Sequence, residues 1–146
     1  MENQITLPVG MSSFTEIRQN HYYYIDKTGL IEHLNKKIST EEKCIALSHA
    51  RRFGKSHAAG MIDAYYSLGC DSTKLFEDTT IAESSDFKKY MNKYNVIHLD
   101  ISSVWDFHKE DLVESIHERV CEDFQKEYED TLNYDKDLYL LIHPLA

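Results

Sequence analysis

The chain of 146 residues contains only five glycines, two prolines and three cysteines. So little glycine and proline excludes collagen-like and low-complexity sequence. The odd number of widely spaced cysteines, Cys44, Cys70 and Cys121, argues against a disulfide framework and against a zinc finger. No apolar run approaches the roughly 20 residues of a membrane-spanning helix, and the polar N-terminus does not resemble a secretory signal. We therefore expect a cytoplasmic protein that does not contact the membrane.

The charge of the chain is strongly acidic but unevenly distributed. Its net charge is -9, and the stretch from Asp106 to Asp137 holds 12 acidic residues against four basic ones. Such a surface repels phosphates, so direct binding of nucleic acid is not expected. In contrast, His49–His57 contains Arg51, Arg52 and Lys55 and no acidic residue. This basic island indicates a local anion site within an acidic chain.

Hydrophobic spacing and capping residues predict five helices. Ser13 and Glu16 have the spacing of a capping box, which places the first helix near Phe14. The last and longest should run from about Lys109 to Tyr128, with its acidic residues on a solvated face. The other three are expected from Thr28 to residues 36–38, from Ala58 to a stop at Gly69, and around Phe87 after Ser84 or Ser85.

Two short apolar runs, Cys44–Ser48 and Val96–Ile101, have the composition of strands buried on both faces. Tyr22–Ile25 is also β-prone, and Leu138–Ile142 could begin a third core strand. Because each of the two clear runs is followed by a helical pattern, the fold class predicted is α/β. The expected architecture is a partial P-loop NTPase-like parallel sheet with flanking helices, the first half of a doubly wound domain.

The turn between the first of these strands and its helix has the pattern of a variant phosphate-binding loop, or Walker A motif. A complete loop reads G-x-x-x-x-G-K-[ST]. In this chain Gly54-Lys55-Ser56 match the last three positions of the pattern, whereas His49 stands in place of the first glycine. Lys55 can hold the outer phosphates, and the Ser56 hydroxyl can bind Mg²⁺. The expected nucleotide-binding residues are Arg51, Arg52, Phe53, Gly54, Lys55 and Ser56. The alternative is an ordinary basic turn whose arginines pair with surface acids.

Several motifs follow one another along the chain: Leu7–Gly10, Phe14, Ile17-Arg18, Tyr22–Thr28, Arg51–Ser56 and Val96–Asp100. In this order they resemble the AAA-ATPase-like domain found in bacterial proteins, often N-terminal to a restriction-endonuclease-like nuclease domain. The resemblance implies binding of ATP and Mg²⁺. It also implies that residues 1–146 form one incomplete domain, with a helical lead-in over 1–40 and the first half of the P-loop core over 41–146.

The chain departs from the family pattern in two places. His49-Ala50 stands where the family has Arg-Pro, and the acidic strand that polarises the metal and activates water is missing before the chain stops. Asp100 ends an apolar run, but it follows the second predicted strand, whereas the metal-binding acid normally follows the third. We therefore assign no catalytic residue and expect a truncated domain that does not hydrolyse ATP by itself.

Other interpretations of the sequence stay open. Asp26-Lys27-Thr28 either caps a helix through Thr28 or lies near the base or ribose of a nucleotide. His108 with Glu110 or Asp111 is a weak metal pair without a third ligand. The chain could also be a degenerate interaction module, or the remnant of a larger ATPase-nuclease protein, that docks on a partner protein or forms a homo-oligomer.

Overall fold

The structure is a computed structural model that describes residues 6–11, 13–48, 50, 53–100 and 112–127. The chain divides into two compact units, residues 1–98 and residues 99–146. The candidate loop lies in the first unit. The predicted strand at Leu138–Ile142 lies outside the described residues.

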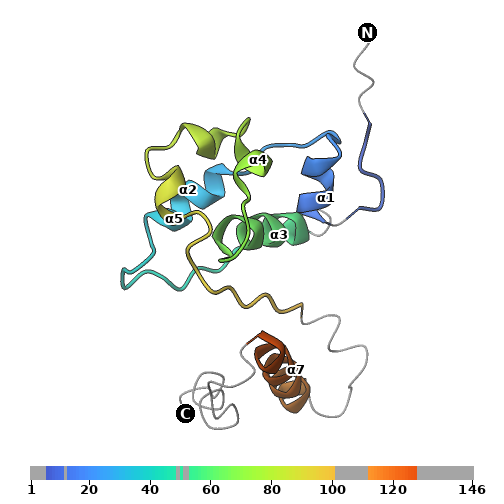
Figure 1. The fold of residues 1–146 in the computed structure, drawn as a ribbon, viewed down its shortest axis with the longest axis vertical. Coiled ribbons are helices and arrows are strands. Elements are labelled where there is room, and N and C mark those ends of the chain that lie inside the picture. The colour runs from blue at the N-terminus through green and yellow to red at the C-terminus, as the bar shows by residue number, and fades with distance from the viewer. Residues whose placement is uncertain (1–5, 12, 49, 51–52, 101–111, 128–146) are drawn as a thin grey trace. The chain divides into compact units, whose positions relative to one another are not determined.

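The described part of the first unit is built from short helices (Figure 1). α3 packs against α1, and α1 also packs against α4. The 3-10 helix η1 contacts both α2 and α5. The elements are α1 (Phe14–Gln19), α2 (Gly29–Asn35), α3 (Lys55–Tyr66), α4 (Thr73–Phe76), η1 (Thr80–Glu83) and α5 (Phe87–Tyr90).

The predicted helices of this unit are confirmed, and the capping chemistry at the first is as expected. The Ser13 hydroxyl accepts a hydrogen bond from the Glu16 amide at 3.3 Å, which satisfies one of the unpaired amides of the first turn. α3 ends at Tyr66, and Gly69 follows in a turn with a φ of 87°. That left-handed conformation is accessible to glycine at little cost.

The predicted parallel sheet is wrong for the part of the chain that the structure describes. Residues 44–48 and 96–100 have no regular secondary structure, and Ile45, Leu47 and Ile97 keep 41%, 50% and 54% of their surface exposed. An apolar run can form a strand only where a neighbouring strand accepts and donates its backbone hydrogen bonds. Among the described residues, the one parallel contact is an isolated bridge between Ser67 and Tyr94.

The core of the first unit is aromatic and centred on α3. Tyr65 and Met61 are fully buried, and Tyr65 lies edge-on to Tyr66 with ring centroids 4.8 Å apart. Buried Asn35 of α2 links both rings, because its amide donates to the Tyr65 hydroxyl at 3.3 Å and its carbonyl accepts from the Tyr66 hydroxyl at 2.6 Å. Burial raises the pKa of both tyrosines, so the hydroxyls stay protonated and can donate. α3 is therefore held firmly along its C-terminal half.

The second unit contains α7 (Leu112–Glu127), which confirms the long acidic helix over these residues. Glu114, Glu118 and Glu122 are exposed, as expected for a solvated face. None of the described helices has both the length and the apolar composition needed to cross a membrane.

Candidate functional site

The candidate site begins where the chain turns into α3. Gly54 is the N-cap of this helix and has a φ of 79° and a ψ of 32°, a left-handed conformation that costs most other residues about 1–2 kcal/mol. Its carbonyl accepts the Ala58 amide at 3.0 Å, the first bond of the helix. Gly54 thus reverses the chain, and the first amides of α3 lack partners within the helix. Such amides can bind an anion, and the helix dipole adds partial positive charge there.

Lys55 and Ser56 form the first turn of α3 and are both exposed. The Lys55 ammonium donates to the Ala50 carbonyl at 3.2 Å, so its side chain folds back over the preceding turn. The Phe53 amide donates to the same carbonyl at 3.3 Å and closes that turn. Of the six predicted binding residues, the structure therefore places four at the start of α3: Phe53, Gly54, Lys55 and Ser56. Of the remaining predicted residues, Arg51 and Arg52 lie outside the described residues, as does His49.

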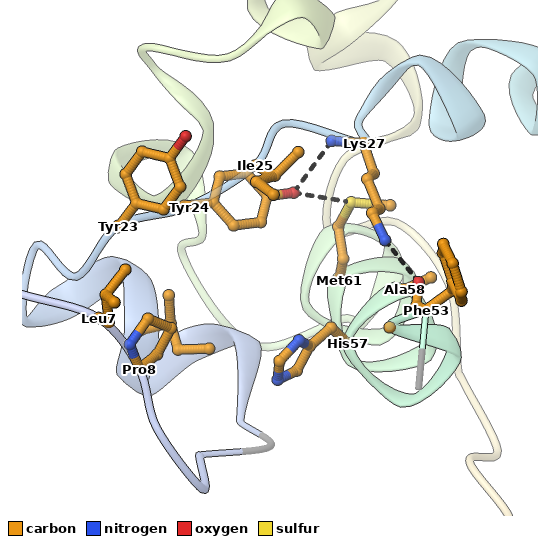
Figure 2. Close-up of a pocket in the computed structure, with 12 residues that line it drawn as sticks. Leu7, Pro8, Tyr23, Tyr24, Ile25, Lys27, Phe53, His57, Ala58 and Met61 are labelled. Carbon is orange, nitrogen blue, oxygen red and sulfur yellow. Dashed lines mark hydrogen bonds between the residues drawn. The ribbon is translucent and has the colours of Figure 1, made fainter. Parts of the chain in front are cut away.

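A second lysine, from a distant part of the sequence, also reaches this turn. The Lys27 ammonium donates to the Phe53 carbonyl at 2.7 Å (Figure 2). A Cβ placed on Gly54 would lie 2.9 Å from the same ammonium. The space beside Gly54 is therefore occupied by the flexible end of Lys27. From the sequence, Asp26-Lys27-Thr28 could be either a helix cap or a segment near the base or ribose, and neither interpretation indicated this contact.

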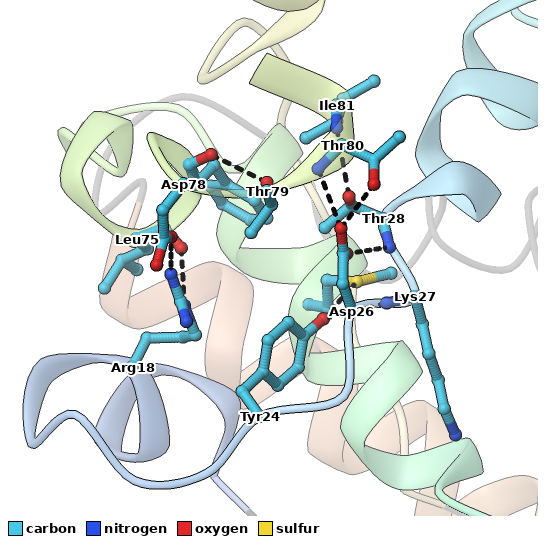
Figure 3. A network of polar contacts seen from close by, with 12 residues as sticks. Arg18, Tyr24, Asp26, Lys27, Thr28, Leu75, Asp78, Thr79, Thr80 and Ile81 are labelled. Atoms are coloured by element: carbon cyan, nitrogen blue, oxygen red, sulfur yellow. Dashed lines mark hydrogen bonds and ion pairs between the residues drawn. The ribbon is translucent and has the colours of Figure 1, made fainter. Parts of the chain in front are cut away.

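The residues on either side of Lys27 fix its backbone to η1 (Figure 3). The Asp26 carboxylate accepts the Thr28 amide at 2.8 Å, the Thr80 amide at 2.8 Å and the Thr80 hydroxyl at 2.6 Å. Partial burial alone would raise the pKa of Asp26, but these hydrogen bonds outweigh it and lower the pKa to about 2. The Asp26 carboxylate is thus anionic at neutral pH and firmly bound.

Thr28 does not cap α2 with its side chain, although it stands at the N-cap position as predicted. Its hydroxyl is fully buried and instead accepts the Ile81 amide at 3.1 Å. The capping interpretation is therefore corrected, because a buried hydroxyl finds a better partner across the core than within its own turn. Asp26 and Thr28 both serve to attach the segment to η1.

A cavity of about 460 Å³ opens beside the turn. Its lining is mostly apolar, with Lys27 and His57 as its basic residues (Figure 2). The lining residues are Leu7, Pro8, Ile17, Tyr23, Tyr24, Ile25, Lys27, Phe53, Gly54, His57, Ala58 and Met61. A cavity of this size, with a mostly apolar lining and a few polar groups, is typical of a small-molecule site.

Two contacts hold the N-terminal segment along the side of this cavity. The Nε2 atom of His57 lies 2.8 Å from the Met11 carbonyl oxygen, so it is the nitrogen that carries the proton, since a carbonyl only accepts. The Tyr23 amide donates to the Thr6 carbonyl at 2.9 Å. His57 and the cavity were not predicted, because neither leaves a pattern in the sequence.

The described residues give no support for a metal site built from several protein ligands. No cluster of three or more His, Cys, Asp or Glu side chains that could hold a metal ion occurs among them. Asp100 is exposed in a segment without regular secondary structure and belongs to the second unit. His108, Glu110 and Asp111 lie outside the described residues.

Comparison with known families gives the class of protein. The chain belongs to the AAA-ATPase-like family, described as predicted AAA-ATPases, which matches residues 8–143. Neither a curated protein nor a solved structure matches the chain. The resemblance found in the sequence is thereby confirmed at the level of the family, while the truncation and the nuclease neighbour stay predictions.

Several residues of the motifs shared with the family pack or form hydrogen bonds within the first unit. Phe14 and Ile17 are buried. Arg18 pairs with Asp78, donates to the Leu75 carbonyl at 2.9 Å and lies 5.0 Å from the centre of the Tyr24 ring. These residues hold the helices together, whereas Lys27, Lys55 and Ser56 are exposed.

Proposed function

We propose that this chain binds a nucleoside triphosphate with Mg²⁺, with the phosphates at the start of α3. The single observation that carries the proposal is the left-handed Gly54 immediately before Lys55 and Ser56, on a helix whose other end is fixed in the core. This is the chemistry expected of a phosphate-binding loop: close backbone approach, partly positive amides and a lysine. Membership of a family of predicted AAA-ATPases supports ATP as the nucleotide.

The cavity beside Gly54 supports a place for the base and ribose. It is next to the phosphate position, its walls are mainly apolar and aromatic, and its volume of about 460 Å³ is in the range of small-molecule sites. The Tyr23 ring offers flat aromatic surface to a purine, and Ile25 and Ala58 add apolar surface to the lining. In this arrangement the phosphates lie in water and the base is sheltered.

Mg²⁺ fits this site as a companion of the phosphates and not as an ion held by the protein alone. Ser56 would hold the ion through its one hydroxyl oxygen, and water and the phosphates would supply its other ligands. None of the described residues that line the cavity carries a carboxylate that could activate water. The proposed function is therefore binding, and hydrolysis by this chain alone is not proposed.

The test is calorimetric titration of Mg·ATP into the wild-type chain and into Lys55→Ala. We expect the variant to bind at least about tenfold more weakly, which corresponds to about 1.4 kcal/mol. Lys93→Ala is the matched control, because Lys93 is also exposed but belongs to a different part of the first unit. Equal heats for wild type and Lys55→Ala would refute the proposal.

A second candidate function, docking of a partner protein or a second copy, is favoured by the exposed apolar runs. Ile45, Leu47 and Ile97 each leave about half of their surface in contact with solvent. Exposed apolar side chains can contribute to an interaction surface. Size-exclusion chromatography with and without Mg·ATP separates the candidates, because an oligomer that ignores the nucleotide favours docking.

A further inference from the structure

Two ammonium groups rest on backbone carbonyls of the same turn. Lys55 donates to Ala50, and Lys27 donates to Phe53. Lys27 has no carboxylate within 4 Å among the described residues, since none of their ion pairs includes it. A full positive charge is thus held against a neutral carbonyl, at the place where the helix N-terminus would attract an anion.

The alternation of Asp26, Lys27 and Thr28 explains why the lysine points this way. Asp26 and Thr28 are both tied to η1, while the Lys27 side chain extends away from η1 toward the start of α3 (Figure 3). Asp26 and Thr28 together accept four hydrogen bonds from residues 28, 80 and 81. The backbone conformation of Lys27 is therefore restricted, and its long side chain extends to Phe53.

We infer that Lys27 is a second phosphate-binding residue, which reaches the nucleotide from outside the loop and exchanges the Phe53 carbonyl for a phosphate oxygen. The inference rests on the proposed function and adds a residue that the loop pattern does not contain. The exchange is favourable because the ammonium then faces an acceptor of opposite charge instead of a neutral carbonyl oxygen. It requires only a small movement, because the ammonium already lies over Gly54.

The same exchange would also make room for a phosphate beside Gly54. An ammonium at 2.9 Å from the Cβ position leaves no room there for an anion while Lys27 keeps its present rotamer. A lysine stem has several rotatable bonds, so the ammonium can move aside and remain in contact with the arriving phosphate. Lys27 thus covers the loop without a nucleotide and holds the nucleotide once it is bound.

Asp26 is, in this arrangement, a positioning residue for Lys27. It accepts hydrogen bonds from Thr28 and from Thr80 and does not contact the turn itself. Asp26→Asn keeps the shape of the side chain but removes the charge and one acceptor. We expect this variant to weaken Mg·ATP binding about threefold, less than the loss of Lys27.

The test compares Mg·ATP binding by wild type, Lys27→Met, Lys27→Arg and Lys93→Ala. Met keeps an apolar stem without the charge, and we expect about tenfold weaker binding; Arg should restore the affinity to within about threefold. Lys93→Ala should bind as wild type does. Because Lys27 is exposed, the thermal midpoints of the variants should agree with that of the wild type, and this is measured alongside.

Chemical modification gives a readout that a merely structural role would not change. Acetylation of the Lys27 amine by acetic anhydride, followed by mass spectrometry, should slow when Mg·ATP is added, while acetylation of Lys93 should not. If Lys27→Met binds as wild type does while Lys55→Ala is weakened, the inference is overturned and the proposed function stands. If neither variant is weakened, both are overturned.

Discussion

Replacing Gly54 by alanine tests the geometry of the turn more sharply than removing a charge. The φ of 79° costs an alanine about 1–2 kcal/mol, and its Cβ would lie 2.9 Å from the Lys27 ammonium. The contact itself is inexpensive, because the ammonium is the free end of a flexible chain. The backbone cost therefore dominates. We expect the free protein to relieve this cost by leaving the left-handed conformation. Binding must then restore that conformation, so the affinity should fall about 5–30-fold.

Gly69→Ala is a matched control for this variant. Gly69 has a φ of 87°, so an alanine there meets the same backbone penalty, but nothing lies within 4 Å of its Cβ position. Gly69→Ala should lose about 1–2 kcal/mol of unfolding free energy in urea, whereas Gly54→Ala should lose less, because the free protein relieves its strain. Only Gly54→Ala should lose affinity for a fluorescent ATP analogue in a titration with Mg²⁺. Equal affinities for the two variants, or equal losses, would refute the assignment of Gly54 to the site.

Three further predictions concern the scaffold. Asn35→Ala removes the partner of two buried tyrosine hydroxyls and should cost about 2–4 kcal/mol in urea unfolding. Met61→Ala, at a fully buried position, should cost about 2–5 kcal/mol in the same assay. The pKa of Asp26 is lowered from 3.8 to about 2, so its contribution is complete above about pH 4 and is lost as pH falls toward 2. Because Asp26 is exposed, about 1 kcal/mol is expected, and Asp26→Asn should remove that acid dependence in thermal unfolding.

Helices α1, α2, α3, α5 and α7 are predictable from the sequence because their signals are local, whereas the four-residue helices α4 and η1 were not predicted. Ser13 and Glu16 predict the start of α1, and the apolar spacing from Ala58 onward predicts α3. The sheet was predicted from equally local patterns at 44–48 and 96–101, and there the prediction is wrong for the described residues. An apolar run identifies a segment able to pair, but the partner and register of a strand depend on distant residues.

The candidate site divides in the same way. Gly54, Lys55 and Ser56 are consecutive, so the motif and the helix after it could be recognised from the sequence. Lys27 is separated from Phe53 by 26 residues, and its contact depends on how η1 holds Asp26 and Thr28. The Asp26-Lys27-Thr28 triplet can be recognised in the sequence. Which way the Lys27 side chain extends, however, depends on the hydrogen bonds that Asp26 and Thr28 accept from Thr80 and Ile81.

The central claim is that a polyphosphate binds to the backbone at the start of α3. The most direct measurement is a titration of the ¹⁵N-labelled chain with Mg·ATP, followed by amide chemical shifts in two-dimensional NMR spectra. The account predicts that the largest shifts occur at Gly54, Lys55 and Ser56, with smaller shifts at Lys27 and little change at Gly69. A saturating titration that leaves these three amides unmoved would contradict it.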